Sequence, residues 1–113
     1  MLSSENRLRK KEDFSSLYKR SNFKANRNFM IRYRRGVKKI GIVVSNKHGK
    51  ANVRNLLKRR IRAIVRNLLP KMESYDIIIT PKIGAADLSY GELSRNLSHV
   101  LKLGGIIKWD LLL

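Results

Sequence analysis

The middle of the sequence reads KANVRNLLKRRIRAIVRNLLP over residues 50–70. With a turn of about 100° per residue, its apolar side chains gather in one stripe that we expect to face the core. This stripe comprises Val53, Leu57, Ile61, Ile64, Val65 and Leu68. The pattern predicts a helix from Asn52, as its capping residue, to Leu69, because Pro70 ends it.

A band of basic residues borders this stripe. Arg54, Lys58, Arg62 and Arg66 follow one another at i+4 spacing, with Asn55 and Arg59 beside them. Residues four apart lie on the same side of a helix. We therefore expect the helix to bury one side in the core and to carry positive charge along the edge of the buried side.

The excess of positive charge extends far beyond this helix. No acidic residue occurs between Asp13 and Glu73, whereas 18 of the 26 Lys and Arg lie there. A net charge of +18 on 113 residues exceeds what solubility requires, and it favours a polyanionic partner whose phosphates Lys and Arg neutralise. We therefore expect a nucleic acid partner rather than a basic surface that is only solvated.

The composition excludes several classes of protein. The chain has no cysteine, which excludes disulfide bonds and cysteine-based zinc sites. It shows no signal peptide and no apolar run of about 20 residues, so we expect a cytoplasmic protein without membrane contact. His48 and His99 match no metal-ligand or catalytic spacing.

We expect a single domain over residues 1–113, with residues 106–113 either packed on it or disordered.

Helix and strand patterns alternate before the central helix. A helix is expected over residues 10–20, with Phe14, Leu17 and Tyr18 on one side. Residues 23–35 alternate between two sides, which predicts one half-buried strand or two. One side carries Phe29, Ile31 and Tyr33, and the other carries Met30, Arg32 and Arg34. Residues 38–45 are then expected to return as a buried antiparallel strand.

Two further elements are expected after the central helix. Residues 75–81 contain an isoleucine run and predict another buried strand. Ser89 and Glu92 have the spacing of a capping box, which predicts a helix that continues to Leu101 and ends at Gly104 and Gly105. The order of elements is therefore αβββαβα, or αββαβα if residues 23–35 form one strand.

Five segments, in order along the chain, resemble the protein subunit of bacterial ribonuclease P, the ribonucleoprotein that removes 5′ leaders from precursor tRNAs. The most specific is GKANVRNLLKRRIR at residues 49–62. The others are RLRKKEDF at 7–14, ANRNF at 25–29, GIVVSNK at 41–47 and DIII at 76–79. The resemblance covers most of the chain, and agreement in five ordered places is not expected by chance.

The resemblance implies an α+β fold, namely a single two-layer α/β sandwich of order αβββαβα with a mixed four-stranded sheet. It also implies a left-handed βαβ crossover, where general rules predict a right-handed one. The implied partners are the catalytic RNA subunit and precursor tRNA, with no obligate protein partner. Catalysis would belong to the RNA subunit with bound Mg²⁺, so we expect no catalytic residue, metal ligand or cofactor in the protein itself.

The resemblance also assigns two sets of binding residues. The central helix would bind the RNA subunit through Lys50, Arg54, Asn55, Lys58, Arg59, Arg62 and Arg66. A cleft for the single-stranded leader would be lined by Phe14, Tyr18, Met30 and Arg32. These residue types suit the two tasks, because Lys and Arg neutralise phosphates and aromatic faces stack on bases of any sequence.

Two positions depart from the family pattern. Leu56 stands where the family usually has a basic residue, so one RNA contact is either missing or taken over by Arg60. Arg32 stands where some members present an aromatic side chain to the leader. This second replacement is expected to make the cleft more electrostatic and less dependent on stacking.

Alternatives stay open for the residues and for the function. Without the family resemblance, Phe14 and Tyr18 fit core positions better than binding positions, because small domains bury their aromatic residues. The charge alone also fits a structural RNA-binding protein of the ribosomal type, without a role in cleavage. A membrane-surface module is disfavoured, because the core uses the apolar stripe of the basic helix.

Overall fold

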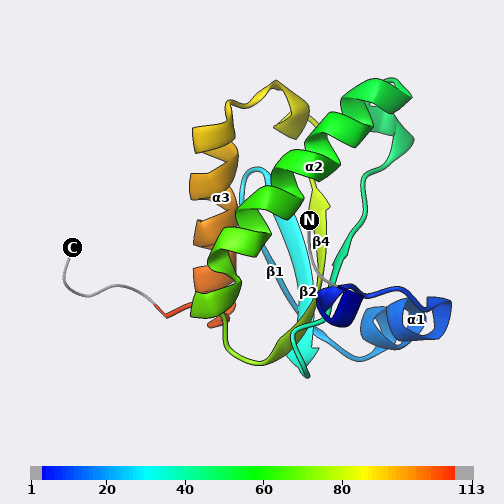
Figure 1. Cartoon of the computed structure of the whole chain (residues 1–113), viewed down its shortest axis with the longest axis vertical. Coiled ribbons are helices and arrows are strands. Elements are labelled where there is room, and N and C mark those ends of the chain that lie inside the picture. Colours follow the sequence, from blue (N-terminus) through cyan, green and yellow to red (C-terminus); the bar gives the residue numbers. More distant parts are fainter. Residues whose placement is uncertain (1–3, 109–113) are drawn as a thin grey trace.

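The computed structural model describes residues 4–108 as a four-stranded sheet with three α-helices (Figure 1). In chain order these elements are α1 (Lys11–Lys19), β1 (Asn22–Ala25), β2 (Phe29–Arg35), β3 (Ile40–Ile42), α2 (Ala51–Leu68), β4 (Tyr75–Pro81) and α3 (Tyr90–Leu103). The αβββαβα order is confirmed, because residues 23–35 form two strands. Between them, the Asn26 side-chain oxygen accepts hydrogen bonds from the backbone N–H groups of Asn28 and Phe29, at 3.0 and 2.9 Å, and so closes the β1–β2 turn.

The sheet is mixed, as predicted, but one of its pairings was not foreseen. Its strand order is β1-β2-β4-β3, with β3 parallel to β4 and the other two pairs antiparallel. The predicted return of residues 38–45 in the direction opposite to the preceding strand is correct, because β3 runs antiparallel to β2. The strand is shorter than predicted, Ile40–Ile42, and it pairs with β4, which lies between it and β2. The apolar run Ile77–Ile79 of β4 is buried on both faces of the sheet, and β4 has a neighbouring strand on each of its two edges.

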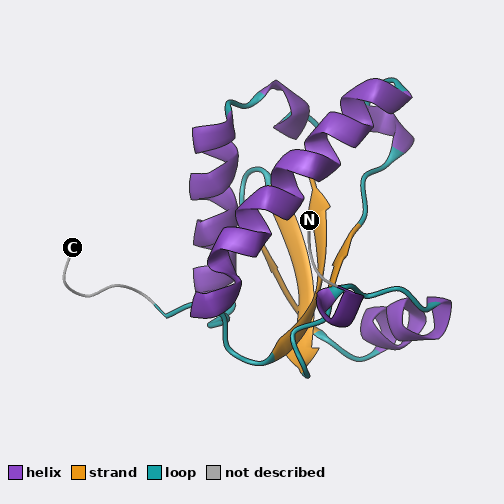
Figure 2. Ribbon diagram, viewed as in Figure 1, coloured by secondary structure: helices purple, strands orange, loops and turns teal. Residues whose placement is uncertain are grey.

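The helices cover the two faces of the sheet unequally. On β4, Ile77 and Ile79 belong to the main core beneath α2 and α3, whereas Ile78 belongs to a small cluster with Leu8 and Leu17 of the α1 side. The helices α2 and α3 lie together over the sheet, and the short α1 stands apart from both (Figure 2). Because α1 has only nine residues, it covers only part of its face.

The two long helices begin in different ways. The helix α2 begins at Ala51, with Lys50 as its N-cap and no side-chain cap, so the prediction of Asn52 as the cap is wrong by two residues. The helix α3 begins with the predicted capping box, in which Ser89 and Glu92 exchange hydrogen bonds of 3.1 and 3.2 Å. The bonds from Ser89, the backbone N–H foremost, lower the pKa of the Glu92 carboxyl.

The apolar stripe of α2 faces the core in its middle but not at its start. Leu57, Ile61, Ile64 and Val65 are buried, whereas Val53 is exposed. After α3, Ile106 and Ile107 are also buried, so the beginning of the predicted tail packs on the domain. Residues 109–113 lie outside the described part of the chain. None of the helices within residues 4–108 combines the length and the apolar character needed to cross a membrane.

The turn from β2 to β3 depends on Asp76 and on a glycine. The Asp76 side-chain oxygen accepts hydrogen bonds from the backbone N–H groups of Val37 and Lys39, both at 3.0 Å. A Cβ on Gly36 would collide with that carboxylate. The absence of a side chain at Gly36 therefore lets the carboxylate bind this turn.

We expect Gly36→Ala to destabilise the protein by about 1 to 3 kcal/mol, because the added methyl group displaces the Asp76 carboxylate from the two N–H groups. Urea unfolding measures this change. The matched control is Gly91→Ala in the first turn of α3, where a Cβ meets only the flexible end of Arg95. That control should gain about 0.4 to 1 kcal/mol. Equal stability of Gly36→Ala and the parent protein would contradict the role assigned to this turn.

Candidate nucleic-acid interface

The predicted basic residues of α2 gather around a shallow hollow on its solvent side. Five side chains line this hollow of about 420 Å³, namely Asn52, Asn55, Lys58, Arg59 and Arg62. Four of them were predicted as binding residues, and Asn52 joins them because it lies inside the helix instead of capping it. Within residues 4–108, none of the α2 cations forms an ion pair with a carboxylate. We call these five residues the α2 basic face.

The other predicted residues of α2 lie around this face. Arg54 turns toward the start of the helix, where its Nε donates a hydrogen bond to the Gly49 carbonyl at 3.2 Å. Lys50 is the N-cap residue, and Arg66 is exposed in the last turn. The first turn of α2 contains no acidic residue, so nothing offsets the partial positive charge of its free N–H groups. The whole length of α2 is therefore suited to bind anions.

Leu56 and Arg60 lie on the opposite flank of α2 from the basic face. They line a second hollow of about 530 Å³, whose other lining residues are Lys47, His48, Val53, Leu57, Ile83, Gly84, Ala86 and Asp87. Leu56 is 39% exposed there. Arg60 therefore does not take a place beside Arg59 in the first hollow, and its contribution belongs to a different surface.

A second candidate site lies between α1 and the sheet. It is a small hollow of about 190 Å³ lined by Tyr18, Phe23, Met30, Ile31, Arg32, Val43 and Thr80. The hollow brings together three of the four residues predicted for the leader cleft, namely Tyr18, Met30 and Arg32. It lies on the part of the sheet face that α1 leaves uncovered. We call it the α1 cleft.

The fourth predicted cleft residue, Phe14, is not among the residues that line the α1 cleft. Its ring packs against the small cluster of Leu8, Leu17 and Ile78. A Cβ on Gly41 would lie 2.7 Å from two atoms of this ring, so the ring lies flush against the backbone of β3. Phe14 is partly buried against this cluster, whereas Tyr18 is 46% exposed at the cleft.

Sequence reasoning missed Phe23, which completes the α1 cleft. Phe23 is directly opposite Arg32 across the β1–β2 pair. The Arg32 guanidinium carbon lies 5.3 Å from the centroid of the Phe23 ring and 5.6 Å from that of Tyr18. Both distances are within the range of cation–π contacts. The turn residues Asn26 to Asn28 were the available signal, because a short turn after Ala25 sets this register.

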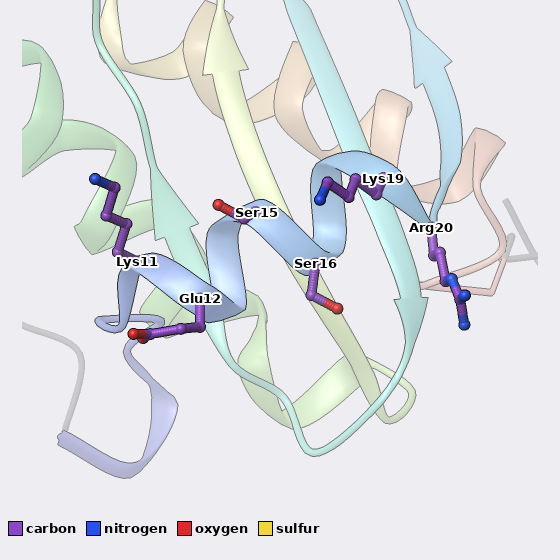
Figure 3. A pocket seen from close by; sticks show the side chains of 6 residues that line it. All are labelled: Lys11, Glu12, Ser15, Ser16, Lys19 and Arg20. Atoms are coloured by element: carbon purple, nitrogen blue, oxygen red, sulfur yellow. The ribbon is translucent and has the colours of Figure 1, made fainter.

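The outer side of α1 carries a third hollow of about 480 Å³ (Figure 3). Lys11, Ser15 and Lys19 project to one side of the helix, and Glu12, Ser16 and Arg20 project to the other. The Ser16 hydroxyl accepts a hydrogen bond from Arg34 Nη1 at 2.7 Å, which joins α1 to β2. This contact keeps Arg34 beneath α1 and leaves Arg32 as the β2 cation at the cleft.

The two histidines take part in structural hydrogen bonds. His48 Nε2 lies 3.1 Å from the Pro81 carbonyl oxygen, and His99 Nδ1 lies 3.2 Å from the Asn26 amide nitrogen. Among residues 4–108, no three His, Cys, Asp or Glu side chains lie close enough together to hold a metal ion. The two candidate hollows on α2 and beside α1 are lined by cationic and aromatic side chains, residue types suited to nucleic acid.

Comparisons with known proteins agree with this surface chemistry. The Ribonuclease P family model matches residues 2–103. The Ribonuclease P protein component of Streptococcus agalactiae serotype III is 38% identical over 104 residues, which cover 89% of this chain and 95% of that protein. The solved RNase P protein of Staphylococcus aureus matches with a TM-score of 0.83 at 31% identity, covering 91% of this chain and 98% of that one. The RNase P protein of Thermotoga maritima matches with a TM-score of 0.79 at 30% identity, covering 86% and 96%. This chain therefore belongs to the ribonuclease P protein family.

Proposed function

We propose that this protein binds the catalytic RNA of a ribonuclease P through the α2 basic face and the 5′ leader of precursor tRNA through the α1 cleft. The observation that carries the proposal is the α2 basic face, where Lys58, Arg59 and Arg62 surround one hollow and form no ion pair with any carboxylate of residues 4–108. Membership of the ribonuclease P protein family implies an RNA partner and a place in tRNA processing.

The shapes of the two sites support different RNA ligands. The α2 basic face is shallow and cationic, so it suits the phosphates of a folded RNA surface. The α1 cleft is smaller and combines Tyr18 and Phe23 with one cation. Unpaired nucleotides can enter such a cleft, because their bases are free to stack on aromatic rings, whereas the bases of a duplex are already stacked.

In this proposal the protein supplies binding and charge, and the RNA subunit supplies catalysis. The Mg²⁺ ions needed for cleavage would be held by the RNA subunit. The net charge of +18 offsets phosphate repulsion between the catalytic RNA and its substrate, and so lowers the demand for Mg²⁺. Such processing would take place in the cytoplasm, where precursor tRNA is made.

We expect the protein alone to leave precursor tRNA uncleaved and to restore cleavage by a cognate catalytic RNA at low Mg²⁺ concentration. The reason is that the cations of the protein replace part of the screening otherwise provided by Mg²⁺. Single-turnover cleavage assays over a range of Mg²⁺ concentrations measure this effect. A structural RNA-binding protein of the ribosomal type would bind RNA without restoring cleavage. Cleavage by a nuclease-free preparation of the protein without RNA would refute the division of labour.

We expect Lys58→Ala, Arg59→Ala and Arg62→Ala each to weaken binding to the catalytic RNA. Each variant loses about one phosphate contact, so the slope of log affinity against log salt should fall by about one unit. Filter binding at several salt concentrations measures the slope. Each folding stability should change by less than about 1 kcal/mol, because no variant removes a core side chain. The control Arg95→Ala removes a cation from the surface of α3 and should leave the slope unchanged.

We expect Tyr18→Ala to weaken binding of precursor tRNA that carries a leader, and to leave binding of mature tRNA unchanged. Loss of one stacked base should cost about 1 to 3 kcal/mol of binding free energy. Affinities of the reconstituted holoenzyme for both RNAs, together with the melting temperature of the protein, test this expectation. The control is Tyr90→Ala, which removes a similarly exposed tyrosine from α3. Equal losses for both RNAs with a large melting shift would assign Tyr18 to the core instead.

A further inference from the structure

We propose that Arg32, held between the rings of Tyr18 and Phe23, binds one phosphate of the leader, and that Phe23 is the residue that positions it. This inference rests on the proposed function, because it specifies how the α1 cleft contacts a single strand. It assigns a role to Phe23, to which the family resemblance gave none. It also assigns phosphate binding to Arg32, at a position where some family members present an aromatic side chain.

Two aromatic rings from different elements contact the Arg32 guanidinium. Phe23 and Arg32 are paired across β1 and β2, so their side chains project from the same face of the sheet. Tyr18 approaches from α1, and the guanidinium carbon lies 5.6 Å from its ring centroid and 5.3 Å from that of Phe23. Contacts on two sides restrict the rotamers of a long side chain, so less entropy remains to be lost when it binds an anion.

The charge of Arg32 has no partner of opposite sign in the cleft. The other residues that line the α1 cleft are apolar or uncharged, and within residues 4–108 no carboxylate forms an ion pair with Arg32. A guanidinium offers five N–H donors, and contacts with ring faces leave donors for an anion. A phosphate can accept two of these hydrogen bonds at once, which suits a guanidinium held in a fixed position.

The same geometry disfavours the insertion of a base between the two rings. Arg32 already lies over one side of Tyr18 and of Phe23, so an inserted base would first have to displace it from both. A phosphate needs no such displacement. The effect of Arg32 on leader affinity therefore distinguishes the two modes of binding. Arg32 strengthens the binding of a phosphate and weakens the binding of an inserted base.

The test uses holoenzyme reconstituted with a cognate catalytic RNA. Its substrates are precursor tRNAs in which one leader linkage at a time is an uncharged methylphosphonate. With the parent protein, neutralising one particular linkage should weaken binding about tenfold, as expected for the loss of a hydrogen bond between charged groups. With Arg32→Gln, binding of the unmodified precursor should weaken by a similar factor, and the same linkage should no longer matter.

Two further variants separate positioning from charge. Phe23→Leu retains an apolar side chain but removes the ring, so the effect of the critical linkage should shrink to about half on a logarithmic scale. Lys24→Gln removes one positive charge from the other face of β1 and should leave the full effect of the linkage in place. Phe23 is 48% exposed, so the melting temperature of Phe23→Leu should match that of the parent protein.

Three other outcomes would contradict either the phosphate proposal or the leader-binding function. If Arg32→Gln binds the unmodified precursor as tightly as the parent protein or more tightly, a base occupies the cleft and the phosphate proposal is wrong. If no linkage depends on Arg32, although Arg32→Gln weakens leader binding, the proposal is likewise wrong. If the parent holoenzyme does not distinguish precursors with and without a leader, the leader-binding function itself fails.

Discussion

The central strand β4 has to be covered on both faces, and this requirement determines where the other elements lie. Ile77 and Ile79 need cover on one face and Ile78 on the other. The helices α2 and α3 provide the first cover, and α1 with Leu8 provides the second. Because α1 is short, its cover ends before the sheet does. The α1 cleft is the part of the sheet face that remains open, so the candidate leader site follows from the incomplete covering of one face.

The same arrangement leaves the charged side chains of residues 4–108 at least partly exposed. Among residues 4–108, no charged or polar residue is classed as buried, so the core carries no cost of burying charge. The positive charges instead repel one another across the surface, since only eight Asp and Glu accompany 26 Lys and Arg. A bound polyanion removes this repulsion, and any ligand that binds only the folded state stabilises it. Binding of the proposed RNA partner would therefore also stabilise the fold.

Local patterns in the sequence predicted the features that depend on neighbouring residues. Helical periodicity located the buried residues in the middle of α2, alternation located the two sides of β2, and spacing located the capping box of α3. The partner of β3 could not be predicted in this way, because it depends on which strand occupies the centre of the sheet. That choice depends on the burial of β4, which follows β3 by more than 30 residues.

The two candidate sites also differ in how far the sequence could predict them. The α2 basic face could be predicted, because one helix supplies all of it. The α1 cleft combines side chains from α1, β1 and β2, so the role of Phe23 required the register of two strands. Phe14 and Tyr18 share a helix side in the sequence, yet only Phe14 lies over Gly41. Helical periodicity shows which residues share one side of α1, but it does not show which of them lie over the sheet and which lie beyond its covered part.

The position of β4 between two strands that precede it in the chain has a consequence for synthesis on the ribosome. The strands β2 and β3 emerge first, and their central neighbour follows only after the whole of α2. Until then Phe29, Ile31 and Tyr33 have no completed core, and the edges of β2 and β3 that pair with β4 have no partner strand. Exposed strand edges and apolar side chains promote association between incomplete chains. Between Asp13 and Glu73 the growing chain gains Lys and Arg but no acidic residue. Unfinished chains therefore carry a large net positive charge and repel one another. The lysines and arginines thus protect the unfinished protein from aggregation before any of them has an RNA to bind.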